Sequence, residues 1–155
     1  MVNPSTALQE PIGIIGAGQL GTSLGKSLLA QGVPKVLAYN LPSDTKARER
    51  AESAGMIWLD NPAGLNEARI IFAAVTADSA VHAAQACASS IHPDAVYIDL
   101  NSMGPNEKNA AAAVVTDAGR RFIDGAVLGA AADGIKMPII VSGDDAQGVA
   151  ERLTL

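Results

Sequence analysis

The sequence predicts an α/β fold of the doubly wound class, in which helices cover both faces of a mostly parallel sheet. Apolar segments of strand length alternate with segments of helix length from residue 12 onward. The strand segments are continuously apolar, which is typical of strands buried on both faces. The composition agrees, because 48% of the 155 residues are hydrophobic and only 3% are aromatic. A core of Ala, Val, Ile and Leu suits close packing of helices on a sheet.

The expected elements follow one another in a regular order. We expect strands over 12–16, 35–40, 56–59, 70–75, 95–100, 121–124 and 138–143. We expect helices over 20–31, 44–54, 62–68, 78–90, 105–118 and within 144–155. Gly32, Gly55 and Gly119 follow three of these helices, in the place where glycine commonly ends a helix. Pro105 stands in a first turn, where its missing N–H costs nothing.

The length fits one domain, which buries about two-thirds of the surface of its unfolded chain. We assign residues 1–10 to an irregular N-terminal arm and residues 11–155 to the domain. The charge of −5 provides no basic field for nucleic acid or an anionic membrane surface. No apolar run approaches a membrane span, and the first residues lack the regions of a signal peptide. Cys87 is the only cysteine, so no internal disulfide can form, and we expect a soluble, cytoplasmic protein. We expect the thiol of Cys87 to be buried, because Cys is among the most buried residue types.

Three glycines follow the first expected strand with the spacing GxGxxG. Gly16 permits a tight turn, Gly18 lets the backbone approach a pyrophosphate, and Gly21 lets the helix pack closely on the sheet. The free N–H groups and the positive dipole end of the 20–31 helix form an anion site. We therefore expect Gln19 and Leu20 to line a dinucleotide together with the three glycines, in a Rossmann-type domain. The alternative is a strand-to-helix turn that needs only small residues.

The end of the second strand bears on which dinucleotide binds. An NAD site usually has an acidic residue there, which holds the ribose 2′-hydroxyl, but this chain has Asn40. A neutral amide does not repel a 2′-phosphate, so we expect NADP to be preferred to NAD. Candidate phosphate donors follow at Ser43, Lys46, Arg48 and Arg50. Alternatively, the basic residues form a solvated helix face with the interleaved Glu49 and Glu52.

Two later stretches carry a family resemblance when they are read together with the glycines. They are DLNSMGP at 99–105 and FIDGAVLGAAADGIKMPIIVSGDD at 122–145. The chain resembles the β-hydroxyacid dehydrogenases, the superfamily of 3-hydroxyisobutyrate and 6-phosphogluconate dehydrogenases. Members have a Rossmann-type domain followed by a helical domain, and they oxidise a hydroxyl β to a carboxylate with NAD or NADP. The resemblance implies that Val75 and Thr76 lie along the cofactor, and that Asn101 and Ser102 lie near nicotinamide and substrate as catalytic residues.

A simpler alternative for Asn101 and Ser102 is a role in capping a helix, because Asn and Ser are also favoured helix caps. The chain departs from the family at Leu128, which replaces a Ser that helps hold the substrate carboxylate. Reduction of an imine or keto group is therefore as open as oxidation of a hydroxy acid. The family's catalytic Lys belongs to the start of the helical domain, and Lys26, Lys108 and Lys136 do not match its position. We expect His82 and His92 to be surface or capping groups, and no cluster has metal-ligand spacing.

Two functions follow from these patterns. The first is the NAD(P)-binding domain of a β-hydroxyacid-dehydrogenase-like oxidoreductase, without the helical domain of the family. Such a domain takes part in hydride transfer between nicotinamide and a small hydroxy acid or a related carbonyl or imine compound, and the resemblance leaves open a homodimer through the helical domain. The second is a stand-alone dinucleotide-binding or sensor module without turnover.

Overall fold

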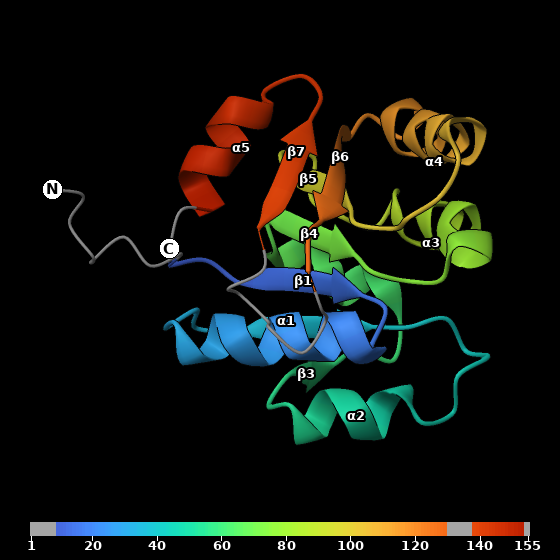
Figure 1. The fold of residues 1–155 in the computed structure, drawn as a ribbon. Coiled ribbons are helices and arrows are strands. Elements are labelled where there is room, and N and C mark those ends of the chain that lie inside the picture. The colour runs from blue at the N-terminus through green and yellow to red at the C-terminus, as the bar shows by residue number, and fades with distance from the viewer. Residues whose placement is uncertain (1–8, 130–137, 154–155) are drawn as a thin grey trace, which may run out of the picture.

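Seven strands form one sheet in the computed structural model, which describes residues 9–129 and 138–153 (Figure 1). The strand order is β3-β2-β1-β4-β5-β6-β7. The strands are β1 (Ile12–Ile15), β2 (Val36–Tyr39), β3 (Ile57–Trp58), β4 (Ile70–Ala73), β5 (Val96–Asp99), β6 (Arg121–Val127) and β7 (Ile139–Ser142). All neighbours are parallel except β6 and β7. The prediction of a doubly wound, mostly parallel α/β fold is therefore confirmed.

Helices cover both faces of this sheet. They are α1 (Gln19–Ala30), α2 (Ala47–Ser53), α3 (Ala80–Cys87), α4 (Pro105–Asp117) and α5 (Ala146–Leu153). One apolar core joins α1, α2 and α5 to residues such as Ile14 and Phe72. The other joins α3 and α4 to residues such as Ile15 and Ile71. Successive strand residues thus enter opposite cores, which explains why the strands are continuously apolar.

The order of the strands reverses between β1 and β4. From β1 the chain moves outward through β2 to β3, crosses back to β4, and then moves in the other direction through β5 and β6. The register places Ile14 of β1 opposite Ala38 of β2 and Phe72 of β4. Ligands of open α/β sheets bind beyond the carboxyl ends of the strands at such a reversal. The predicted glycine turn follows β1 at this point.

The structure differs from the expected elements in three places. Residues Pro62–Glu67 form the 3₁₀ helix η1 in place of an α-helix, with Pro62 in its first turn and the side chain of Asn61 accepting a hydrogen bond from Ala63 N–H at 3.0 Å. The expected 78–90 helix divides into the 3₁₀ helix η2 (Ala77–Ser79) and α3. Strand β7 runs antiparallel to β6, and the connection over 128–138 is shorter than the dozen or more residues that a parallel crossover needs.

The predicted helix ends are confirmed. Gly32, Gly55 and Gly119 have φ values of 96°, 84° and 75°, in the left-handed region that favours glycine. Residues 1–8 of the expected N-terminal arm lie outside the described residues. Over the ranges 9–129 and 138–153, no helix has the length and apolar character needed to cross a membrane.

Candidate functional site: a groove at the carboxyl ends of the strands

The glycine turn between β1 and α1 contains two glycines that the protein's own packing requires. Gly16 has a φ of 104°, and a Cβ there would lie 2.2 Å from the carbonyl oxygen of Ala74. A Cβ on Gly21 would lie 1.9 Å from the carbonyl oxygen of Gly16. Real Cβ contacts are never so short, so both positions must be glycine for the turn to close and for α1 to lie against it.

Gly18 differs from these two residues. A Cβ at Gly18 would meet no heavy atom within 4 Å, and its φ of −82° is open to any residue. No protein atom therefore accounts for a glycine here. Gly18 is also the N-cap residue of α1, and no side chain caps the helix. The first N–H groups of a helix lack intrahelical acceptors and attract anions. This geometry fits a pyrophosphate, which would occupy the space that a side chain would fill.

Two side chains hold the peptide groups that flank this turn. The Oδ1 atom of Asn40, directly after β2, accepts a hydrogen bond from Ala17 N–H at 2.9 Å. The Nε of Arg50, from α2, donates to the carbonyl oxygen of Ala17 at 2.7 Å. Asn40 also donates from Nδ2 to the carbonyl oxygen of Leu41 at 3.1 Å. The amide of Asn40 therefore shapes the turn, a role that its sequence position alone did not indicate.

A groove with a volume of about 360 Å³ lies over this turn. It is lined by Gly16, Gly18, Gln19, Leu20, Asn40, Leu41, Ser43, Asp44, Ala74, Val75, Thr76 and Ser79. Seven of the residues expected to bind cofactor are among them, and Gly21 lies beneath the turn. Ser102 does not line this groove. The structure thus brings together polar groups that follow three adjacent strands, β1, β2 and β4.

Both arginines on the β2 side of the groove are paired with carboxylates. The guanidinium of Arg50 forms an ion pair with the carboxylate of Asp44. This hydrogen bond is the main reason why the pKa of Asp44 is lowered from its ordinary value. Arg48 instead pairs with Glu52 at 2.8 Å and with Asp60 at 3.5 Å. The solvated-face interpretation therefore describes Arg48, whereas Arg50 contacts the glycine turn itself.

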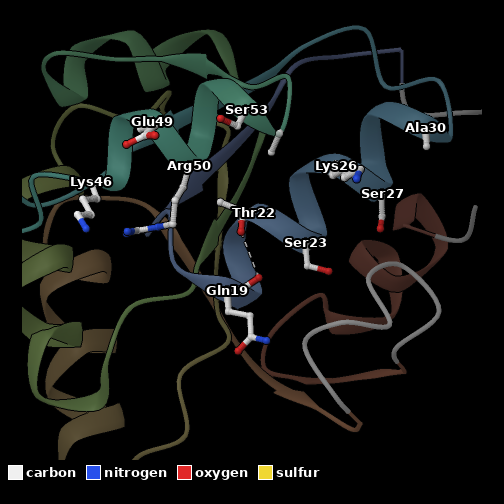
Figure 2. Close-up of a pocket in the computed structure, with 11 residues that line it drawn as sticks. Gln19, Thr22, Ser23, Lys26, Ser27, Ala30, Lys46, Glu49, Arg50 and Ser53 are labelled. Atoms are coloured by element: carbon white, nitrogen blue, oxygen red, sulfur yellow. Dashed lines mark hydrogen bonds between the residues drawn. The ribbon is translucent and has the colours of Figure 1, made fainter.

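A second, larger groove of about 940 Å³ runs between α1 and α2 (Figure 2). Figure 2 shows Lys46 and Arg50 toward one end of this groove and Lys26, Ser27 and Ala30 toward the other. Gln19 lines both grooves. Lys46 has no ion-pair partner among the described residues. Arg50 pairs with Asp44, which lines the strand-end groove, and the backbone N–H of Lys46 donates to the same carboxylate.

Asn101 and Ser102 lie two and three residues after Asp99, the last residue of β5. Asn101 is 5% exposed, and its Oδ1 accepts a hydrogen bond from Val75 N–H, after β4, at 2.7 Å. Ser102 is exposed. The capping alternative is wrong for both residues, because the N-cap of α4 is Gly104 and no side chain caps that helix. Asn101 instead connects the ends of β4 and β5.

Sequence reasoning missed a cluster of charges beside these residues. The Nζ of Lys108 lies 2.9 Å from Asp99 Oδ1 and 2.8 Å from Asp124 Oδ1. Asp99 and Asp124 are paired in register on β5 and β6. The available signal was an acidic residue at the end of two successive strands, with a Lys in the helix between them. Lys108 does not match the family's catalytic position, and its role in this cluster was not predicted.

The remaining candidates lie outside the groove. His82 is exposed on α3, and His92 Nδ1 accepts a hydrogen bond from Asp94 N–H at 3.0 Å, as expected for a capping group. Cys87 is buried, and desolvation raises the pKa of its thiol to about 12. Leu128 is 49% exposed, and Lys136 lies outside the described residues. No three metal-ligating side chains gather anywhere in the described ranges.

Comparison with known proteins places this geometry in context. A family model, the NAD binding domain of 6-phosphogluconate dehydrogenase, matches residues 11–152. A conserved hypothetical protein from Sinorhizobium meliloti 1021 is 32% identical, with a TM-score of 0.86 over 96% of this chain and 52% of its own. A comparison with curated protein sequences gave no match.

Two solved enzymes share the fold at lower identity. Mycobacterium tuberculosis 3-hydroxyisobutyrate dehydrogenase, determined with L-serine, is 18% identical with a TM-score of 0.82, over 94% of this chain and 51% of its own. A Streptomyces aurantiacus imine reductase is 19% identical with a TM-score of 0.75, over 94% of this chain and 53% of its own. The chain spans about half the length of these solved relatives.

Proposed function

The chain belongs to the family of NAD-binding domains of 6-phosphogluconate dehydrogenase, and from this premise we propose that it binds NADP in preference to NAD in the strand-end groove. The observation that carries the proposal is the open space at Gly18, where a Cβ would meet no protein atom within 4 Å. Gly16 and Gly21 are explained by packing, and Gly18 is explained by a ligand. A turn that needed only small residues would not require a glycine at this position.

The preference for NADP rests on the end of β2. Asn40 stands at the usual place of the acidic ribose ligand, so no negative charge lies there. Both polar atoms of its amide are engaged by backbone groups of Ala17 and Leu41. Asp44 carries a negative charge nearby, but Arg50 is paired with it, and Lys46 adds a further positive charge. The net charge of these three residues is positive, which favours a 2′-phosphate.

Hydride transfer is the reaction that we propose for the protein of which these residues form the cofactor domain. The bound nicotinamide supplies or accepts the hydride. Asn101 and Ser102 lie at the adjoining end of β5, where they would contact the nicotinamide or the substrate. The substrate class is a small hydroxy acid or a related carbonyl or imine compound. The similarity to a hydroxyacid dehydrogenase and to imine reductases supports this range, and Leu128 disfavours simple carboxylate recognition.

A second candidate is a dinucleotide-binding module without turnover. It is favoured by the position of Lys108, whose ammonium group pairs with Asp99 and Asp124 and does not line the strand-end groove. Residues 1–155 should then bind NADPH but leave its absorbance unchanged with a panel of hydroxy acids, keto compounds and imines. General acid–base catalysis is typically worth about 10²- to 10⁴-fold. Steady turnover by residues 1–155 would exclude the module.

Binding itself is tested with Gly18→Val, in calorimetric titrations of NADPH and NADH. The valine side chain extends into open space, so the fold should remain intact while both affinities fall by about 100-fold or more. Ala30→Val, at the other end of α1, is the control and should bind like the wild type. Unchanged affinity in folded Gly18→Val would overturn the proposed groove.

A further inference from the structure

The ammonium group of Lys108 is enclosed by acceptors at the end of β5. Lys108 lies in the first turn of α4, and its side chain is 14% exposed. Its Nζ donates to Asp99 Oδ1 at 2.9 Å, to the carbonyl oxygen of Asn101 at 2.9 Å, and to the carbonyl oxygen of Asp99 at 3.3 Å. An ammonium group has three N–H donors, so these hydrogen bonds use all of them, and Asp124 Oδ1 adds an ion pair at 2.8 Å. A solvated surface lysine would not be held in this way.

The same network fixes Asn101 at three points. Its backbone N–H donates to Asp99 Oδ1 at 2.9 Å, and its carbonyl oxygen accepts from Lys108. Its side-chain Oδ1 accepts from Val75 N–H at 2.7 Å. The Nδ2 atom remains, buried and without a partner among the described residues. An unpaired buried donor costs about 1–3 kcal/mol, and such a group in a site calls for a ligand as its partner.

The position of Asn101 indicates which part of a dinucleotide it would meet. Asn101 bonds to Val75, which lines the strand-end groove. The groove extends from Asn40, after β2, past Gly18 to Val75 and Thr76, after β4. With a pyrophosphate at Gly18 and the adenosine half on the β2 side, the nicotinamide half extends toward β4 and β5.

We infer that Lys108 is a positioning residue, which holds Asn101 so that Nδ2 donates a hydrogen bond to the carboxamide oxygen of the cofactor's nicotinamide. The inference rests on the proposed cofactor site. Lys108 does not touch the ligand, and it acts through the carbonyl oxygen of Asn101 and through Asp99. The ion pair with Asp124 also keeps the ammonium group at the strand ends.

The test compares two ligands that differ only in the group that Asn101 would meet. NADPH contains nicotinamide, and 2′-phospho-ADP-ribose lacks it but retains both riboses and all phosphates. Lys108→Met should weaken NADPH by about tenfold, which is the value of one buried hydrogen bond, and leave the fragment unchanged. Asn101→Ala should have the same effect. In the Asn101→Ala background, Lys108→Met should cause no further loss, since both changes remove one interaction.

A purely structural role for Lys108 predicts different results. An equal loss of affinity for both ligands in Lys108→Met would overturn the inference. Additive losses of NADPH affinity in Asn101→Ala/Lys108→Met would also overturn it. Lys108→Met leaves the Asp99 carboxylate buried without its cation, so the variant is also made as Asp99→Asn/Lys108→Met, which removes both charges. We expect this double variant to have a higher melting temperature than Lys108→Met but the same weakened affinity for NADPH. Recovery of affinity would show that Lys108 only neutralises Asp99.

Two further measurements separate this inference from the proposed function. Lys35→Met breaks the exposed ion pair with Glu67 and should leave both affinities unchanged. NADH is titrated in parallel against ADP-ribose, so the comparison does not depend on the preference for NADP. Wild type that binds none of these ligands would overturn the proposed site and the inference with it. If the wild type binds all of them, and the ratio of dinucleotide affinity to fragment affinity is the same in Lys108→Met, the inference alone would be overturned.

Discussion

The side-chain Oδ1 of Asn40 accepts a hydrogen bond from the backbone N–H of Ala17 at 2.9 Å, so the end of β2 holds the turn that follows β1. The two residues are 23 positions apart. In the same turn, Arg50 binds the carbonyl oxygen of Ala17. The backbone that would meet the pyrophosphate is therefore held in place from the neighbouring strand and helix, before any ligand arrives.

Asn40→Asp should change the cofactor preference. The carboxylate can still accept the hydrogen bond from Ala17, so the turn should persist, while its charge repels a 2′-phosphate and accepts hydrogen bonds from ribose hydroxyls. We expect the ratio of NADPH to NADH affinity to fall by about tenfold or more, as measured by calorimetry. Asn66→Asp adds the same charge at an exposed position of η1 and should leave the ratio unchanged. An unchanged ratio in Asn40→Asp would contradict the assignment of the ribose to this end of β2.

Arg50→Gln should raise the pKa of Asp44 toward its ordinary value, because the hydrogen bond from Arg50 is the main cause of the lowered pKa. The folded-state pKa lies below the unfolded one. The stabilising contribution of the pair is therefore present above the ordinary pKa and is lost as pH falls through the lowered one. The carboxyl chemical shift of Asp44, followed by NMR, measures the change. Arg48→Gln, which breaks a different ion pair, serves as the control, and a pKa of Asp44 that stays equally low in Arg50→Gln would rule out this cause.

Cys87 should be inert toward thiol reagents in the folded protein. Burial raises the pKa of its thiol to about 12, so only about one thiol in 10⁴ is ionised at pH 8. Ellman's reagent should release no colour at pH 8 from native protein and one equivalent from protein in concentrated guanidinium chloride, since the chain has one cysteine. Fast reaction of native protein would mean that α3 opens readily. The raised pKa also predicts that stability falls as pH rises above the ordinary thiol pKa.

Tyr97→Phe should keep or raise the free energy of unfolding, by up to about 1 kcal/mol. The hydroxyl of Tyr97 is buried and has no hydrogen-bond partner among the described residues, so its removal eliminates an unpaired polar group. The ring stack with Phe122, at a centroid distance of 6.1 Å, is retained. Urea denaturation measures the change. A loss of more than about 1 kcal/mol would show that the hydroxyl forms a hydrogen bond in solution.

Gly16→Ala and Gly18→Ala should differ sharply in stability. The first substitution places a Cβ 2.2 Å from Ala74 and imposes a positive φ on alanine, which should cost about 2–4 kcal/mol. The second meets no protein atom within 4 Å and should change the free energy of unfolding by less than about 1 kcal/mol. Urea denaturation of the two variants in the absence of ligand tests the distinction. Equal losses would remove the argument that Gly18 serves a ligand.

Most of the fold could be predicted from local patterns. The continuous apolar segments at 70–73 and 96–99 identify buried parallel strands, and Gly32 and Gly119 mark helix ends because their φ values are costly for other residues. The antiparallel direction of β7 and the 3₁₀ form of η1 were not predicted. Both depend on how a short connection closes against the sheet, which hydrophobic periodicity does not encode.

The candidate site was predicted only in part. The glycine spacing indicated Gly16, Gly18 and Gly21, because each role follows from backbone geometry. The hydrogen bond from Ala17 N–H to Asn40 and the ion pairs of Lys108 with Asp99 and Asp124 were not predicted. The partner of Asn40 lies in another turn, so its role has no local signal. For Lys108 the available signal was the acidic residue on each of the two strands that flank its helix.

The sequence by itself determined which residues form the sheet, its covering helices and the glycine turn, because burial and backbone conformation depend on neighbours along the chain. The tertiary structure alone decided which polar groups meet at the strand ends. The register that sets Asp99 opposite Asp124 brings both carboxylates to Lys108, and the pairing of β1 with β2 brings Asn40 to Ala17. Those contacts depend on strand order and register, which are set only when the sheet packs between its two apolar cores.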